Sequence, residues 1–161
     1  MRDLPKYSNV LIYKYMELKQ GDKAPDFQAA NQKGEQKKLT DYKGNWLVLY
    51  FYPKDFTPGC TIEACSFRDD HTKLKEYATV VGVSTDSVER HKKFEERFNL
   101  PFELLADPDG KMTEAYGADG KIFKKRVTFL IDPQGVIQKV YPSVKAGEHS
   151  AEVLDDLQKL K

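Results

Sequence analysis

The chain has 161 residues with 26 basic and 25 acidic side chains, which gives a formal net charge of +1. A chain of this length is expected to form one domain whose core needs no disulfide bonds. The balanced charge gives no reason to expect nucleic acid or an anionic membrane as a partner. No stretch approaches the ~18 apolar residues that a membrane-spanning helix requires, and no secretion signal is apparent. Because the chain has only two cysteines, a secreted disulfide scaffold is excluded and a reducing cytoplasm is expected.

Residues 1–17 have no evident place in the fold that the rest of the sequence predicts. Their apolar and aromatic side chains, among them Tyr7, Val10 and Ile12, would suit an added edge strand. Alternatively, Met16 is the natural start of the protein. We favour the second interpretation and expect residues 1–17 to be an extension, poorly ordered or packed on the surface. Residues 18–161 are then the single domain.

The first half of that domain alternates between strand and helix patterns. Residues 26–30 and 36–39 predict a short β-hairpin that turns at Lys33-Gly34, followed by a turn or a single helical turn at 40–44. Residues 46–52 read WLVLYFY, an uninterrupted apolar and aromatic run typical of a buried strand, which Pro53 ends. A helix is predicted to begin at Thr57-Pro58, a hydroxyl at the N-cap followed by proline at the first helical position, and to end near Tyr77.

The second half continues the alternation. Strands are predicted at 79–84, 102–106, 127–131 and 136–141, and helices at 87–98 and 147–160, with a short helix ending at Tyr116-Gly117. Strands that alternate with helices and end in a hairpin and a helix predict an α/β fold, in which helices cover a central sheet.

Cys60 lies in the first turn of the helix that follows the strand at 46–52. Free backbone N–H groups and the positive end of the helix dipole favour an anion at this place. The thiolate is the reactive form of cysteine. The sequence therefore favours a reactive thiol, and the alternative is an inert core cysteine.

Cys65 lies five positions further along the same helix. On a regular helix this spacing separates the Cα atoms by about 8.6 Å, beyond the roughly 7 Å limit of an unstrained disulfide. Either the two cysteines never bond, or the helix unwinds when they do. A small apolar side chain on the inner helix face is the structural alternative for Cys65.

The run from Phe51 to Asp69, FYPKDFTPGCTIEACSFRD, resembles the peroxiredoxins, and specifically the bacterioferritin comigratory protein or peroxiredoxin Q subgroup. Blocks elsewhere in the chain resemble the same family in the same order: GDKAPDF at 21–27, VGVSTD at 81–86, LLADPDG at 104–110 and RVTFLID at 126–132. The resemblance covers the chain from about residue 19 onward. It implies a thioredoxin-like fold with an N-terminal β-hairpin, in which the strand at 127–131 runs antiparallel beside the strand at 46–52.

The resemblance also implies roles for single residues. Cys60 would be the peroxidatic cysteine, with Pro53, Thr57 and Pro58 forming its pocket and Arg126 stabilising the thiolate and polarising the peroxide. Thr57 would cap the helix and also bond a peroxide oxygen. The alternatives are a capping role alone for Thr57, a strand terminator for Pro53, and a solvated basic side chain for Arg126.

Two further pocket residues flank Cys60. Gly59, together with Pro58, is expected to make the start of the helix easy to melt. A carboxylate at Glu63 would oppose the thiolate, so the resemblance suggests that it orients the arginine, the alternative being an exposed helix glutamate. The three histidines, His71, His91 and His149, show no ligand spacing, and neither a metal nor a cofactor is predicted.

The implied function is a thiol-dependent peroxidase that reduces hydrogen peroxide and organic hydroperoxides. Cys60 would become a sulfenic acid, Cys65 would resolve it as an intramolecular disulfide after local unwinding, and a thioredoxin-like dithiol would reduce that bond. A monomer is expected, because both cysteines lie on one helix. The rival functions are a disulfide reductase, which would need a Cys-x-x-Cys motif, and a redox sensor or holdase that does not turn over. A purely structural disulfide is disfavoured by the helix geometry.

Overall fold

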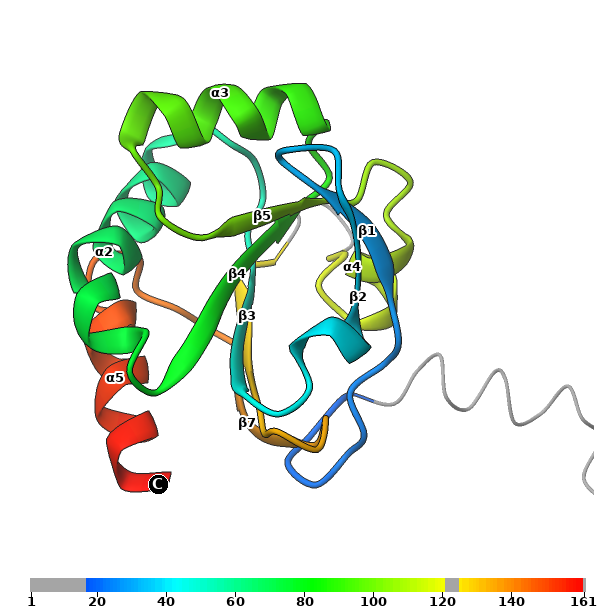
Figure 1. Cartoon of the computed structure of the whole chain (residues 1–161), viewed down its shortest axis with the longest axis vertical. Coiled ribbons are helices and arrows are strands. Elements are labelled where there is room, and N and C mark those ends of the chain that lie inside the picture. Colours follow the sequence, from blue (N-terminus) through cyan, green and yellow to red (C-terminus); the bar gives the residue numbers. More distant parts are fainter. Residues whose placement is uncertain (1–16, 121–124, 161) are drawn as a thin grey trace, which may run out of the picture.

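The computed structural model describes residues 17–120 and 125–160. The elements follow one another in the order β1 (Gln28–Asn31), β2 (Gln36–Lys38), the 3-10 helix η1 (Leu39–Tyr42), β3 (Trp46–Phe51), α2 (Pro58–Leu74), β4 (Ala78–Ser84), α3 (Val88–Phe98), β5 (Glu103–Ala106), α4 (Lys111–Ala115), β6 (Val127–Ile131), β7 (Ile137–Tyr141) and α5 (His149–Leu160) (Figure 1).

The strands of the described residues form one sheet in the order β2-β1-β5-β4-β3-β6-β7. Its centre, β5-β4-β3, is parallel, and β6 runs antiparallel to β3 with Phe51 opposite Val127. Strands β3 and β6 are almost wholly buried, because helices or loops cover both faces of the sheet where they lie. Since β6 begins where β3 ends, the residue that precedes β6 lies beside the residues that follow β3.

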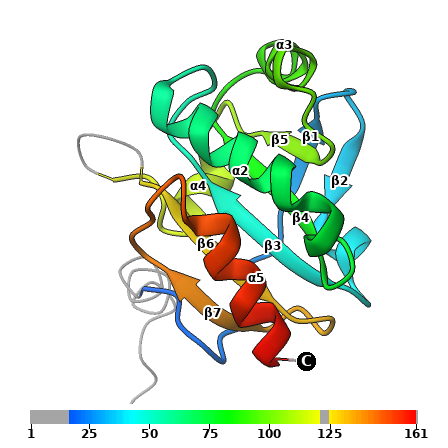
Figure 2. The ribbon, with the colours of Figure 1, turned by 90° about the vertical axis from the view of Figure 1, so that its left-hand side faces the viewer.

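Helices α2 and α5 lie side by side on one face of the sheet (Figure 2). Their inward side chains, such as Phe67 and Leu157, share a buried cluster with Val48 and Tyr50 of β3 and with Phe94 of α3. On the opposite face a second cluster joins Leu49 and Phe129 of the sheet to η1, α4 and the segment around Phe27. The sheet is thus the middle layer, and the cysteine helix α2 is anchored to it along its apolar side.

The predicted mixed sheet with flanking helices and an N-terminal hairpin is confirmed, and the hairpin β1-β2 joins the main sheet by pairing with β5. Two helix boundaries were wrong. Helix α2 ends at Leu74 rather than near Tyr77, because the amides of Glu76 and Tyr77 bond carbonyls three residues back in a tight turn. Helix α5 begins at His149 rather than at 147, where a turn from Lys145 precedes it.

The predictions for residues 1–16, including the possible edge strand, lie outside the described residues. Within the described part of the chain, the helices are all too short or too polar to cross a lipid bilayer.

Candidate active site

Cys60 occupies the first turn of α2, which follows β3 after the loop 52–57. Pro58 takes the first helical position, and Thr57 has the extended backbone of an N-cap residue, with φ −73° and ψ 151°. The Cys60 side chain is buried, with 1% of its surface exposed. An anion on its sulfur would therefore sit among the free N–H groups of the first helical turn.

Arg126 reaches this sulfur from the neighbouring strand. It directly precedes β6, whose first residue pairs with the last residue of β3. Its Nη2 lies 3.5 Å from Cys60 Sγ, and its Nη1 donates to Glu63 Oε1 at 2.9 Å. The alternative of a freely solvated arginine is excluded by these contacts. Lys124, the first residue of the basic run Lys124-Lys125-Arg126, lies outside the described residues.

Glu63 is fully buried and not an exposed helix glutamate. Burial raises the pKa of its carboxyl to about 7, although Arg126 acts in the opposite direction. Burial also works against the charge on Arg126, but Glu63 and the Cys60 sulfur outweigh it and raise the arginine pKa. The guanidinium is therefore a fixed cation shared between the carboxyl group of Glu63 and the sulfur of Cys60.

Thr57 sits at the N-cap, but its hydroxyl does not cap the helix. Instead, Oγ1 donates to the carbonyl oxygen of Lys54 at 2.8 Å. The prediction of a side-chain cap was wrong, because the hydroxyl turns back into the preceding loop. Since its proton is committed to Lys54, the lone pairs of Oγ1 are free to accept a hydrogen bond from a ligand.

The remaining predicted pocket residues are Pro53, Pro58 and Gly59. Pro53 and Gly59 are half-buried, whereas Pro58 is exposed at the start of the helix. A Cβ atom placed on Gly59 would lie 2.8 Å from Nη2 of Arg126. Glycine at this position therefore leaves the space that the guanidinium fills, a reason that the sequence alone does not suggest.

Cys65 is half-buried, and both cysteines are free thiols. Helix α2 runs without interruption from Pro58 to Leu74, so the helical separation of about 8.6 Å applies to the two Cα atoms. The two sulfurs cannot form an unstrained bond while the helix persists. Contact between them requires unwinding of the first turns.

Features of three buried polar groups near the site could not be predicted from the sequence, although Glu63 itself was predicted as a pocket residue. The hydroxyl of Tyr50 and Oε2 of Glu63 have no hydrogen-bond partner among the described residues. His149 Nε2 lies 2.7 Å from Thr128 Oγ1, and burial together with the charge of Arg126 lowers its pKa to about 4. Their positions depend on contacts between distant parts of the chain, so no local sequence pattern points to them.

Comparison with known proteins places these features in a family. The model of the AhpC/TSA family matches residues 20–140. Peroxiredoxin Bcp of Bacillus subtilis is 48% identical over 151 residues, covering 88% of this chain and 96% of that protein. Chloroplastic peroxiredoxin Q of Sedum lineare is 40% identical, covering 91% and 82% of the two chains. Among solved structures, a cysteine variant of peroxiredoxin Q from Xylella fastidiosa superposes with a TM-score of 0.85 at 32% identity, covering 90% and 98%.

Proposed function

This chain belongs to the AhpC/TSA family as a peroxiredoxin of the Bcp and peroxiredoxin Q type, with the thioredoxin-like fold and thiol-dependent peroxidase activity of that group, and we propose that Cys60 is its peroxidatic cysteine. The observation that carries the proposal is the contact between Arg126 Nη2 and Cys60 Sγ in the first turn of α2. A guanidinium and free backbone N–H groups converge there on one sulfur atom. Both stabilise the thiolate, which is the nucleophile.

In the first step the Cys60 thiolate attacks one oxygen of the peroxide. The O–O bond breaks, an S–O bond forms, and the leaving oxygen takes a proton and departs as water or an alcohol. Arg126 stabilises the charge that moves onto the leaving oxygen, and the lone pairs of Thr57 Oγ1 accept the hydrogen bond of the peroxide O–H. Glu63 holds the guanidinium in place through its bond of 2.9 Å, and Pro53 limits access of water.

In the second step the first turns of α2 unwind and the Cys65 thiol attacks the Cys60 sulfenic acid, which yields an intramolecular disulfide and one water molecule. In the third step an external dithiol exchanges with this disulfide, so that Cys60 and Cys65 return to thiols and the reductant becomes a disulfide. Peroxiredoxins act on peroxides and are reduced by thioredoxin-like proteins, and we propose such a protein as the reductant here.

We propose that the substrates of this protein include organic hydroperoxides as well as hydrogen peroxide. A solved relative, the bacterioferritin comigratory protein of Xanthomonas campestris, is described by its alkyl peroxide reduction activity and is 31% identical to this chain with a TM-score of 0.79. We further propose a monomer of one domain, spanning residues 18–161, that works in a reducing cytoplasm. The placement of both cysteines on the single helix α2 supports the monomer, because no second chain is needed to complete the cycle.

The test is mass spectrometry of the reduced protein after one equivalent of hydrogen peroxide. We expect a Cys60–Cys65 bond within one chain, and an unchanged molar mass by light scattering. Cys60→Ser should abolish peroxide consumption, whereas Cys65→Ser should accumulate sulfenic and sulfinic acid on Cys60. Peroxide consumption by Cys60→Ser at the parent's rate would overturn the assignment. If the parent protein is oxidised once but does not turn over when a thioredoxin system is supplied, it is a redox sensor instead of a peroxidase.

A further inference from the structure

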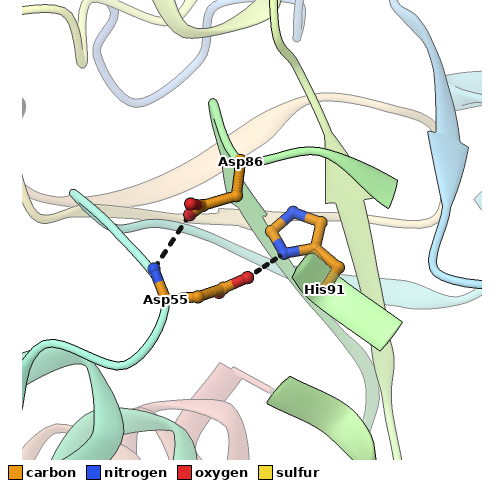
Figure 3. Close-up of side chains that lie close together, drawn as sticks. All are labelled: Asp55, Asp86 and His91. Atoms are coloured by element: carbon orange, nitrogen blue, oxygen red, sulfur yellow. Dashed lines mark hydrogen bonds and ion pairs between the residues drawn. The ribbon is translucent and has the colours of Figure 1, made fainter. Parts of the chain in front are cut away.

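A buried cluster of three ionisable side chains lies beside the cysteine helix but outside the site described so far. It consists of Asp55 from the loop between β3 and α2, Asp86 from the loop between β4 and α3, and His91 from α3 (Figure 3). Asp55 and His91 have no exposed surface. His91 Nδ1 lies 2.6 Å from Asp55 Oδ2, and Asp86 Oδ2 accepts a bond from the backbone N–H of Asp55 at 2.8 Å.

The residue types of this cluster also suit a metal ion, but their geometry does not. The 2.6 Å separation of His91 Nδ1 and Asp55 Oδ2 is that of a direct hydrogen bond and leaves no room for an ion between them. Asp86 is already bonded by Ser84 and paired with the cation of Arg90 at 3.1 Å. The carboxylates are therefore committed to protein donors.

The hydrogen bonds place one shared proton between Asp55 and His91. Nε2 of the ring faces the carbonyl oxygen of Leu105 at 3.0 Å, and because a carbonyl only accepts, Nε2 carries a proton. The hydroxyl of Tyr52 donates to Asp55 Oδ1 at 2.6 Å. The short contact between Nδ1 and Oδ2 then needs a second ring proton or a proton on Asp55. Either arrangement gives a strong bond, shielded from water, between α3 and the loop.

Asp55 is held at each of its polar groups. Its carboxylate bonds Tyr52 and His91, its backbone N–H bonds Asp86, and its backbone carbonyl accepts from Arg90 Nη2 at 3.3 Å. Three of these four partners belong to α3 or to the loop that leads into it. The loop that begins the cysteine helix is thus tied to α3.

The next residue in the chain is strained. Phe56 has φ +67°, a left-handed conformation that a residue with a Cβ rarely adopts and that persists only where the surroundings enforce it. Its ring packs against Phe94 of α3 at 5.1 Å between centroids, beneath the guanidinium of Arg90. Thr57 follows directly and then the helix with Cys60. The bonds to Asp55 therefore hold a strained turn, and the turn fixes the direction in which α2 starts.

We propose that His91 is a positioning residue whose bond to Asp55 clamps the loop 53–57 in the conformation that lets Cys60 attack peroxide, and that the same clamp opposes the unwinding through which Cys65 reaches Cys60. The inference rests on the proposed function, because it concerns the balance between its first two steps. A weaker clamp lets the loop relax from its strained turn. Cys60 is then misplaced for its attack on peroxide, while the unwinding that brings Cys65 to Cys60 no longer has to break the bond between His91 and Asp55.

The test measures the two steps separately by rapid quenching with an alkylating reagent and mass spectrometry. Asp55→Asn keeps the shape of the side chain but replaces the short bond by an ordinary, weaker amide hydrogen bond, and His91→Leu removes the bond. We expect oxidation of Cys60 to slow by about tenfold in His91→Leu, in line with the cost of misplaced reacting groups, and to slow less in Asp55→Asn. We expect disulfide formation, which does not depend on peroxide concentration, to become severalfold faster in both variants.

The matched control is Lys92→Leu, which places the same new side chain at the adjacent exposed position of α3 and should leave both rates unchanged. A merely structural role would slow both steps together or leave both unchanged, and either result overturns the proposal. If His91→Leu does not fold, the isosteric Asp55→Asn decides alone. Failure of the parent protein to oxidise Cys60 would instead refute the proposed function, so the two failures can be told apart.

Discussion

At position 59 the structure leaves no space for a Cβ atom, since one placed there would lie 2.8 Å from Arg126 Nη2. The guanidinium is the far end of a flexible side chain, so we expect Gly59→Ala to displace Arg126 rather than to unfold α2. The displaced cation would lose its contact with Cys60 Sγ, now 3.5 Å. Oxidation of Cys60 should slow by about 10- to 100-fold, measured by stopped-flow kinetics, with the thermal unfolding midpoint nearly unchanged.

The matched control for this prediction is Gly147→Ala. A Cβ at position 147 would meet only the methyl carbon Cγ2 of Ile62, at an ordinary contact distance of 3.6 Å. Activity of this variant should equal that of the parent. A Gly59→Ala enzyme as fast as the parent would show that the position of Arg126 does not limit the first step.

Thr57 allows a second test at a single side chain. Its Oγ1 proton is used by the Lys54 carbonyl, so in our proposal the hydroxyl serves peroxide only as an acceptor. Thr57→Val keeps the shape and removes the oxygen, and we expect the rate of Cys60 oxidation to fall by about tenfold or more. Thr57→Ser keeps the oxygen and should retain most of the rate. Equal rates in the valine and serine variants would contradict a role for the hydroxyl in peroxide binding.

The strand and helix patterns predicted Cys60 in the first turn of a helix, and the family resemblance implied that Arg126 lies at the same end of the sheet. The hydroxyl direction of Thr57 and the burial of Glu63 did not follow, since each depends on a side-chain rotamer and on a partner. The pair Asp55 and His91 was missed for the same reason. Thirty-six residues separate them, and they meet only because β3 and β4 lie side by side.

At the scale of elements, the packing of α2 on the sheet depends on a close contact within the sheet. Gly82 of β4 lies opposite Tyr50 of β3, and a Cβ at Gly82 would come within 2.8 Å of Tyr50 Cζ, 2.9 Å of its hydroxyl and 3.0 Å of Leu104 Cδ2. The Tyr50 ring also stacks on Phe67 of α2 at 4.7 Å, so it cannot move aside. We expect Gly82→Ala to destabilise the protein by roughly 1–3 kcal/mol in denaturant unfolding.

Tyr50→Phe separates the two parts of this contact. It removes a buried hydroxyl that has no hydrogen-bond partner among the described residues, so alone it should be neutral or stabilising by up to about 1 kcal/mol. In the double variant the contact to the hydroxyl disappears while that to Cζ remains. The loss of stability caused by Gly82→Ala should therefore be smaller in the Tyr50→Phe background but still present. If the stability changes of the two single variants add exactly in the double variant, the predicted clash with the hydroxyl is contradicted.

The order of the elements and the antiparallel neighbour of β3 were predictable, because they follow from hydrophobic runs and from the family resemblance. The end of α2 and the start of α5 were misplaced by three and two residues. The turn at 75–77 contains no glycine or proline that would mark the end of α2, and Gly147 lies inside the turn that precedes α5, so it does not mark the first helical residue. What positions the site is therefore the sheet register rather than the helix ends.

For the whole molecule, burial of the site couples its chemistry to the pH dependence of folding. The pKa of Glu63 is about 7 in the folded protein and 4.5 ordinarily. Between these values the unfolded chain releases the proton that the folded protein keeps, so this group makes stability fall as pH rises from 4.5 to 7. Across this interval the group lowers the free energy of unfolding by on the order of 3 kcal/mol. Glu63→Gln removes this pH dependence. The free energy of unfolding of the variant minus that of the parent should therefore rise from pH 4.5 to 7.

His149 acts with the opposite sign over nearly the same interval. Its pKa is about 4 when folded and 6.5 ordinarily, because burial and then Arg126 disfavour the charged ring. Below pH 6.5 the unfolded chain binds a proton that the folded protein excludes, so this group makes stability fall as pH drops toward 4. The parent should thus show only a weak slope from these two groups between pH 4.5 and 6.5, where their contributions oppose each other.

Urea unfolding of parent, Glu63→Gln and His149→Gln at steps of pH from 4 to 7.5 measures both contributions. Relative to the parent, the stability of Glu63→Gln should increase with pH and that of His149→Gln should decrease. If both differences from the parent changed with pH in the same direction, one of the two groups would not keep its neutral form in the folded state. Opposite signs mean that Arg126 faces a neutral histidine and, up to about pH 7, a largely neutral carboxyl. The charge of the guanidinium is then directed mainly to the sulfur of Cys60, which is what the first step of the reaction requires.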